Sequence, residues 1–376
     1  MSNTTNQPAT LPPESAPRVV SLDALRGFDM FWIVGGEEIV HALAKISDAG
    51  VVRLVDQQMD HKPWEGFAFY DLIFPLFVFI VGVSLVFSLS KTIARDGRPA
   101  VVRRLLRRAL LLYVLGVISY GGFATPFAQI RLLGVLQRIA LCYLFAGLAF
   151  CFMKTRGQVI LCGVLLIGYW ALMTWVPVPG VGAGNYAEGK NLANYLDSQY
   201  LPLRKWDGDH DPEGLLSTLP AIATCLLGVF AGTLLKSPRT DRIKVFWLTF
   251  GGLVLVALGW LWNDQFPVIK KIWTSSYVLV AGGYSCLLLA AFYQVVDVWK
   301  FQTWARPFIW IGMNAITIYT VFHLISFEKL AERLVGGELN SHFFGRFGSL
   351  AIAIVVVAMT LVLCWFLYRR KIFLRL

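Results

Sequence analysis

Charged residues are scarce in this sequence. Asp, Glu, Lys and Arg make up 15% of its 376 residues, whereas hydrophobic residues make up 57%. Soluble globular domains usually contain about 25% charged and about 45–50% apolar residues. The mean hydropathy of +0.62 points in the same direction. This deficit of charge excludes an ordinary soluble domain and predicts a protein whose solvent is the lipid bilayer.

Cysteine patterns that bind metals or form disulfides are also missing. The six cysteines lie within or at the edge of apolar stretches, and no two of them form a Cys-x-x-Cys pair. The sequence therefore predicts neither a disulfide framework nor a metal site. No apolar stretch precedes a small-residue cleavage site, so residues 1–17, which are polar and contain proline, are expected to form a disordered tail.

Long apolar segments dominate the rest of the chain. About 20 largely apolar residues suffice to cross the hydrocarbon core of a bilayer. Ten segments meet this requirement, at about residues 27–46, 68–90, 105–122, 132–153, 158–176, 214–235, 243–263, 277–297, 305–326 and 348–368. We therefore expect an all-α fold, a polytopic transmembrane bundle of about ten helices that forms one domain over residues 18–376.

The basic residues predict how this bundle is oriented, because cytoplasmic loops are enriched in Lys and Arg. With a cytoplasmic N-terminus, the inward segments carry 21 Lys and Arg residues and the outward segments carry 12. Both termini are therefore expected in the cytoplasm. The long connection at residues 177–213 is expected outside, where its Trp and Tyr residues favour a folded cap. The net charge of +11 belongs to loop ends next to lipid, so nucleic-acid binding is excluded.

The first apolar segment contains ionisable residues that are costly inside a membrane, by roughly 2.5–3.5 kcal/mol each at a helix centre. Asp29, Glu37 and His41 recur at multiples of four residues and form one stripe on a helix, and Glu38 lies beside them. Asp29 fits a structural ion pair and a functional site equally well. Glu37, closer to the outer end, is favoured as a substrate-binding residue.

The next segment begins with a histidine in an aromatic and acidic setting. His61 lies in an outward loop, Trp64 follows it, and Asp71 begins an otherwise charge-free helix. A lone loop histidine is usually a bystander. A histidine whose ring is oriented by a carboxylate, however, fits the arrangement of a general base and its orienting group.

Arginines suggest anion binding in two places. Arg138 and Gln137 are predicted to be buried one to two turns into the fourth segment, and Arg138 cannot lose its charge. Its partner could be Asp29 or Glu37, or an anionic ligand. The cytoplasmic arginines at 103, 104, 107 and 108 could contact anionic lipid or hold the phosphates of a nucleotide-bearing cofactor.

Two further polar groups lie near the ends of later segments. Asp211-Pro212-Glu213 has the form of a helix start, with Asp as the N-cap and Pro in the first position. A calcium loop is excluded there, because Pro212 stands where that motif requires glycine. The ninth segment carries Asn314, Thr317, Tyr319 and His323, which suit interhelical hydrogen bonds or a ligand equally well.

Seven blocks, in order, resemble the heparan-alpha-glucosaminide N-acetyltransferase family and its bacterial relatives. They are SLDALRGFDMFWIVGGEE, HKPWEGFAFYDLIFPLFVFIVGVS, RLLGVLQRIALCYL, DPEGLLSTLPAIATCLLGVFAG, KKIWTSSYVLVAGGYS, GMNAITIY and YRRKIF. The resemblance extends from about residue 18 to residue 376. It implies a membrane-embedded enzyme that moves an acetyl group from cytoplasmic acetyl-CoA to the amine of a terminal glucosamine on the other side.

The resemblance also implies roles for particular residues. The family's catalytic histidine falls at His61, and a family asparagine falls at Glu37, where this sequence departs from the pattern. The additional N-terminal domain of the lysosomal members is missing, so a bacterial inner membrane is the expected location. His61 is expected to act as a base in direct transfer or, alternatively, as an acetyl carrier.

The complete hypothesis assigns each candidate residue a role. His61 and Asp71 are predicted to be catalytic; Glu37, Trp64, Asp211, Glu213 and Asn314 to bind the aminosugar or glycan acceptor; and Arg138, Arg104, Arg108 and Gln137 to bind acetyl-CoA, with no metal. Two alternatives stay open: an O-acyltransferase of an exported glycan or lipid, and a proton-coupled transporter in which intramembrane carboxylates relay protons. A homodimer is left open as the assembly.

Overall fold

The computed structural model describes residues 19–337 and 344–374, so the predicted tail at residues 1–17 lies outside the described chain. Seven helical stretches in the described residues are long and apolar enough to cross a membrane. They contain α4 (Ile73–Ser119), α5 (Val135–Phe152), α6 (Thr155–Trp175), α8 (Thr218–Lys236), α9 (Asp241–Trp262), α10 (Ser275–Phe292) and α15 (Gly348–Arg369). An eighth crossing is possible for α11 (Arg306–Met313) and α12 (Ala315–Leu324), which are bent by 72°.

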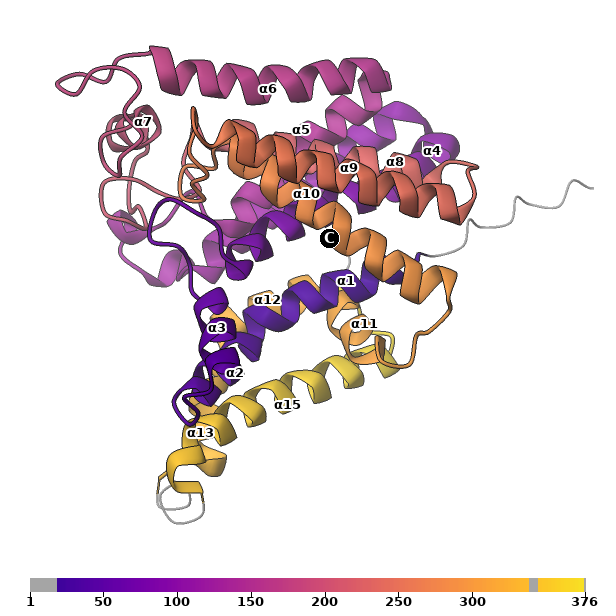
Figure 1. The fold of residues 1–376 in the computed structure, drawn as a ribbon. Helices are drawn as coiled ribbons and strands as arrows, with labels where there is room; N and C mark the ends of the chain where they lie inside the picture. The colour runs from indigo at the N-terminus through magenta and orange to yellow at the C-terminus, as the bar shows by residue number, and fades with distance from the viewer. Residues whose placement is uncertain (1–18, 338–343, 375–376) are drawn as a thin grey trace, which may run out of the picture.

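The shorter helices are α1 (Val20–Phe31), α2 (Glu37–Ala44), α3 (Gly50–Met59), α7 (Leu192–Tyr200) and α13 (Phe327–Val335). The helices pack as two groups, one containing α4–α6 and α8–α10 and the other containing α1, α2, α11, α13 and α15 (Figure 1). α10 also packs against α1 and so connects the groups. Within the described ranges, β-structure consists of two isolated bridges. The predicted all-α bundle is confirmed.

α4 contains two of the predicted spans, residues 68–90 and 105–122. A straight helix of its 47 residues would extend about 70 Å, more than twice the roughly 30 Å hydrocarbon core. The helix is broken at Gly97, whose φ of +76° is readily adopted by glycine. Arg104 Nη1 donates to Thr92 Oγ1 at 2.8 Å, a contact across twelve residues that a straight helix does not allow. α4 therefore turns back at Gly97 as a helical hairpin.

The first predicted span, residues 27–46, is an interrupted helix. α1 and α2 are joined through a π-helical turn, Trp32–Gly36, in which Val34 and Gly35 leave helical geometry. Gly35 has a φ of +125°, which a side chain would strain. The segment does not meet the length and hydropathy requirements of a crossing helix, because its ionisable residues interrupt the apolar run. All ten predicted segments nevertheless coincide with helical structure.

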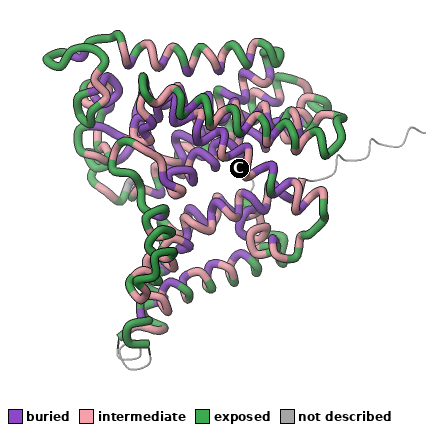
Figure 2. Tube along the Cα trace, viewed as in Figure 1, coloured by how far each residue is buried: buried purple, intermediate pink, exposed green. Residues whose placement is uncertain are grey.

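The outer helices have the surface of a membrane protein. Only 28% of the most apolar stretch of α6, 17% of that of α9 and 28% of that of α15 is buried inside the molecule. Figure 2 shows exposed residues recurring along these helices. Apolar exposure on this scale is stable only where lipid replaces water. The protein is therefore an integral membrane protein.

The long connection at residues 177–213 is folded. It contains α7, whose Leu192 packs in a small apolar cluster with Tyr169 and Met173 of α6 and with Phe266 and Ile269 before α10. The predicted helix start at Asp211-Pro212-Glu213 is wrong, because α8 begins at Thr218. Asp211, the residue predicted to cap the helix, makes other contacts. Its carboxylate accepts a hydrogen bond from the Glu213 amide at 3.0 Å and forms an ion pair with Arg131.

Candidate active site

The loop that carries His61 is held by two other loops. Glu65 forms an antiparallel bridge with Ile269, and the Gly66 amide donates to the Val268 carbonyl at 2.9 Å. The Trp64 indole donates to the carbonyl of Tyr186, in the long connection, at 3.0 Å. The chain before α10 and the connection before α7 are thereby fixed next to His61.

His61 is paired with Asp71. Asp71 Oδ1 lies 2.9 Å from His61 Nδ1, and the Asp71 side chain is fully buried whereas that of His61 is 52% exposed. Asp71 Oδ2 accepts the Ala68 amide at 3.0 Å, and the Tyr277 hydroxyl donates to the Asp71 carbonyl at 2.8 Å. An ionised carboxylate only accepts hydrogen bonds, so a bond from His61 to Asp71 requires the proton on Nδ1, and in that neutral tautomer Nε2 is the ring nitrogen that can accept a proton.

Lys270 is a third member of this group, and the sequence analysis did not single it out. Its Nζ lies 2.9 Å from His61 Nδ1, 3.2 Å from His61 Nε2 and 3.5 Å from Asp71 Oδ1. Burial lowers the pKa of Lys270, while the carboxylates of Asp71, Glu213 and Glu37 act in the opposite direction. The group therefore combines an imidazole, an orienting carboxylate and a cation within hydrogen-bonding distance.

These side chains open into a cavity of about 550 Å³, here called the His61 cavity. Its polar lining comes from segments far apart in the sequence: Glu37, His61, Tyr70, Tyr120, Trp206, Glu213, Lys270, Tyr319 and His323. The Tyr70 ring packs against the His61 ring in a tilted arrangement, with 4.8 Å between centroids and 38° between the ring planes. The predicted residues Glu37, His61 and Glu213 thus share one cavity, which has the size of a small-molecule site.

Arg131 organises the side of the cavity formed by the long connection. Its guanidinium binds Asp211 through two bonds of 2.9 and 2.6 Å and binds Glu213 at 2.5 Å. The rings of Tyr120 and Trp206 lie 4.8 and 4.9 Å from it. The carboxylates hold the pKa of Arg131 above its ordinary value, although burial opposes this effect. Asp211, predicted to bind substrate, is therefore engaged within the protein.

Arg138 has different partners from those expected. It is fully buried, donates to the hydroxyl of Ser217 and lies over the Trp273 ring at 4.9 Å. No bond joins it to Asp29 or Glu37 among the described residues, so that structural pairing is wrong. Asp29 is itself buried, and its two carboxylate oxygens have no hydrogen-bond partner within the described chain.

A second cavity, of about 250 Å³, lies next to the first and is here called the arginine cavity. Its polar lining includes Arg26, Ser84, Arg108, Tyr143 and Asn314. Arg108 lies over the Tyr143 ring at 4.8 Å, and its Nε has no hydrogen-bond partner among the described residues. The two cavities share four lining residues, namely Phe77, Leu136, Ile139 and Ile316. They therefore adjoin through an apolar wall.

The remaining predicted residues lie outside the His61 cavity. Asn314, predicted to bind the acceptor, lines the arginine cavity. Trp64 packs beneath the long connection, and Arg104 closes the hairpin of α4. Gln137 is buried, and its amide donates to the Arg131 carbonyl at 3.4 Å. Of the four residues predicted to bind acetyl-CoA, Arg108 alone is in the lining of either cavity.

The residues that sequence reasoning missed lack a local signal. Lys270 belongs to one of the blocks quoted above, but a lysine in a loop has no distinguishing neighbour in the sequence. Arg131 lies six residues before Gln137, and Tyr120 lies twelve residues after Arg108, so neither adjoins a polar residue that was singled out. Pairing of the loops at Glu65 and Ile269 is what makes Lys270 a site residue.

Comparison with known proteins identifies the family to which this chain belongs. The model of the family "Heparan-alpha-glucosaminide N-acetyltransferase, catalytic" matches residues 18–261, which include His61 and Asp71. The chain belongs to the heparan-alpha-glucosaminide N-acetyltransferase family. It is 28% identical over 371 residues to the human heparan-alpha-glucosaminide N-acetyltransferase, covering 83% of this chain and 55% of the human protein.

Two further acyltransferases are similar to this chain. The mouse heparan-alpha-glucosaminide N-acetyltransferase is 27% identical over 376 residues, which cover 83% of this chain and 56% of the mouse protein. An apolipoprotein N-acyltransferase of Chlamydia pneumoniae is 25% identical over 162 residues, 40% of this chain and 29% of that protein. The chain thus spans about half the length of the family members from human and mouse.

Proposed function

We propose that the protein is a transmembrane acetyltransferase that transfers acetyl from cytoplasmic acetyl-CoA to the amine of a glucosamine-type sugar on the opposite side. The observation that carries this proposal is the His61–Asp71 pair at a cavity that adjoins a second, arginine-lined cavity. Membership of the family supports the reaction class. The predicted cytoplasmic position of both termini belongs to the same proposal.

The arginine cavity suits the donor. Arg108 supplies a guanidinium group whose Nε is unpartnered in the described chain, and guanidinium groups bind phosphates strongly through charge-assisted bonds. Arg26, which is bonded to Asp23 and Ser84, adds positive charge to the same lining. The apolar wall shared with the His61 cavity suits an extended, largely uncharged acyl-bearing chain. A donor held by its phosphates at Arg108 can in this way present its thioester towards His61.

His61 supplies the base. The attacking amine must be neutral, and Nε2 can accept its proton while Asp71 holds the Nδ1 side of the ring. The new C–N bond forms as the C–S bond breaks, and the imidazolium returns the proton to the leaving thiolate. Lys270, beside Nε2, is placed to donate to the carbonyl oxygen as negative charge develops there. The acceptor amine must first displace Lys270 from Nε2.

An acidic third cavity favours a cationic acceptor. This cavity of about 440 Å³ shares Ile33 and Glu37 with the His61 cavity. Glu38, Glu328 and Glu332 also line it, with Lys45 as its basic residue. The carboxylates that line this adjoining cavity attract an ammonium group by long-range electrostatics. An aminosugar, which is protonated in solution, matches this charge better than a neutral hydroxyl acceptor does.

The experiment that tests the proposal measures CoA release by purified protein in liposomes, with acetyl-CoA and a panel of acceptors. Release that depends on glucosamine, but not on N-acetylglucosamine, is expected. Release with acceptors that carry only hydroxyl groups would favour the O-acyltransferase alternative. Absence of release with every acceptor, combined with proton-coupled uptake of a solute, would replace the proposal by the transporter alternative.

A further inference from the structure

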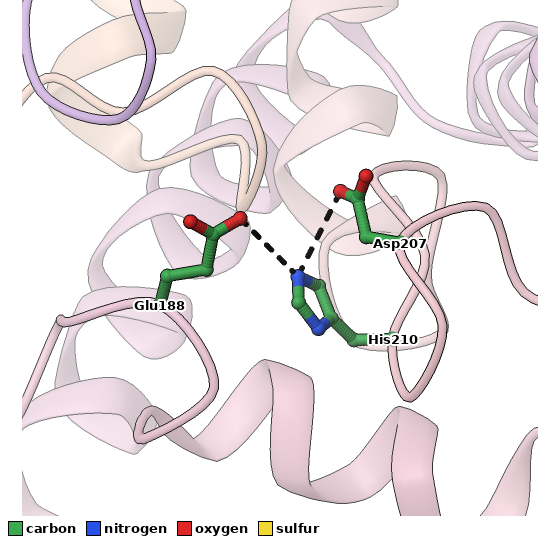
Figure 3. A group of neighbouring side chains, drawn as sticks. All are labelled: Glu188, Asp207 and His210. Atoms are coloured by element: carbon green, nitrogen blue, oxygen red, sulfur yellow. Dashed lines mark ion pairs between the residues drawn. The ribbon is translucent and has the colours of Figure 1, made fainter.

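A second cluster of ionisable side chains lies in the long connection, apart from His61. It consists of Glu188, Asp207 and His210 and is here called the His210 cluster. Figure 3 shows both carboxylates directed towards one nitrogen of the imidazole. His210 Nε2 lies 3.7 Å from Glu188 Oε1 and 3.7 Å from Asp207 Oδ2. Both distances are too long for hydrogen bonds.

The His210 ring is oriented by a fourth residue, Asp209. Asp209 Oδ1 lies 2.6 Å from His210 Nδ1, and the His210 side chain is only 5% exposed. Because an ionised carboxylate accepts only, the proton is on Nδ1 and Nε2 presents a lone pair. Nε2 is buried without a hydrogen-bond partner in the described chain, and Asp207 Oδ2, also buried, has only the ion pair with Lys271. A buried acceptor such as Nε2 is costly unless a donor or a cation satisfies it.

The spacing between the imidazole nitrogen and each carboxylate oxygen matches a small divalent cation, and all three ligand atoms lie within 4.8 Å of one another. Zinc binds imidazole nitrogen and carboxylate oxygen at about 2.0–2.2 Å, which separates tetrahedral ligand atoms by about 3.4 Å. The two separations of 3.7 Å are within a few tenths of an ångström of this value. The pair of Asp209 and His210 also has the form of a carboxylate–histidine–metal arrangement, in which the carboxylate fixes the ring for coordination.

The net charge of the cluster is negative, so the cluster can accommodate a divalent cation. Glu188, Asp207 and Asp209 supply three negative charges, and Lys271 supplies one positive charge. Lys271 Nζ lies 2.7 Å from Glu188 Oε1 and 3.3 Å from Asp207 Oδ2. The Lys271 side chain is 32% exposed, so it can turn outwards and give up these contacts. Lys271 is therefore a competitor for the same oxygens.

We infer that the His210 cluster is a divalent transition-metal site of the zinc type that fastens the long connection. Glu188 lies before α7 and His210 after it, so one ion joins the two ends of the connection. Trp206 and Glu213, which line the His61 cavity, belong to the same stretch of chain. The ion thus has a structural role at the acceptor side and takes no part in acetyl transfer.

The test is zinc binding to tag-free protein in detergent, after removal of bound metal with a chelator. Competition with a chromophoric chelator should give one high-affinity Zn²⁺ per chain and a higher melting temperature. His210→Ala should abolish this binding. Asp209→Asn should weaken it by about 10- to 100-fold, the usual effect of losing the carboxylate behind a metal-bound histidine. Lys271→Met should tighten it, because a competing cation is removed.

A matched control is provided by His41, which forms a similar pair with Asp56 at 2.8 Å outside the cluster. His41→Ala should bind zinc like the parent protein. The inference is overturned if the parent protein binds no stoichiometric Zn²⁺, or if His210→Ala and Asp209→Asn bind it unchanged. These readouts do not use acetyl transfer, so their failure is distinct from failure of the proposed function.

Discussion

Replacing Arg131 by Met should destabilise the protein and disorder the side of the His61 cavity that the long connection forms. Arg131 is bound to two carboxylates whose side chains are 0% and 10% exposed, those of Asp211 and Glu213. Removal of one partner of a buried ion pair typically costs about 3–5 kcal/mol, because the other charge is left buried without compensation. Native proteins have only about 5–15 kcal/mol of stability in total, so the loss should be large.

The pH dependence of this loss has a definite sign. Burial raises the pKa of Glu213, and Arg138 and Arg131 act in the opposite direction. In Arg131→Met one opposing cation is gone, so the pKa of Glu213 rises further and the carboxyl becomes neutral more readily. A raised pKa in the folded state means stability that is present at low pH and lost as pH rises. The difference from the parent protein should therefore shrink from pH 8 to pH 5.

The assay is thermal unfolding in one detergent, followed by tryptophan fluorescence across this pH range. Arg131→Lys keeps the charge but not the paired geometry, so an intermediate loss is expected. A triple variant, Arg131→Met with Asp211→Asn and Glu213→Gln, should recover part of the stability, because no buried charge is left unpaired. An unchanged melting temperature in Arg131→Met, or a deficit that grows as pH falls, would refute the reasoning.

Three other predictions follow from the same contacts. Arg108→Ala should weaken acetyl-CoA binding by about 1.5–3 kcal/mol, the usual contribution of a charge-assisted bond, whereas Arg104→Ala, outside the arginine cavity, should change it little in a calorimetric titration. In intact cells, an impermeant thiol reagent should label Asn185→Cys but not Thr240→Cys. The reverse pattern would overturn the predicted orientation. The six native cysteines are all buried and should not react. Burial raises the pKa of Asp197 to about 6, so its contribution to stability is complete below about pH 4 and is lost as pH rises through 6. Asp197→Asn should flatten the melting profile between those limits, and an unchanged slope would contradict this prediction.

The sequence predicted those features that depend on local pattern. Each of the ten segments predicted from the length of its apolar run coincides with helical structure, because hydrophobic runs are required wherever a helix meets lipid. The sequence pattern did not show that α4 forms a hairpin at Gly97 without a loop, because glycine and proline, here Gly97 and Pro99, also occur in ordinary connections. The start of α8 was misplaced because the Asp211 carboxylate, which could have capped a helix, is instead bound by Arg131.

The candidate site was predictable only where its members are close in the sequence. His61 and Asp71 are ten residues apart, and their proximity was anticipated. Lys270 reaches the same histidine from 209 residues away, through a pairing of loops that no local pattern encodes. The contacts of Arg138 were missed for the same reason: its Nη2 bonds Ser217 and the Gly214 carbonyl and its guanidinium lies over Trp273, all from distant segments, while its Nε and Nη1 have no partner in the described chain.

The most direct test of the account is the rate of acetyl transfer by His61→Ala in liposomes, with acetyl-CoA and glucosamine. Loss of a general base typically lowers the rate by about 10²–10⁴-fold. We expect a loss of at least this size, with acetyl-CoA binding and melting temperature retained and with His41→Ala as active as the parent protein. Near-normal turnover by His61→Ala would contradict the central claim, whether His61 acts as the base or carries the acetyl group.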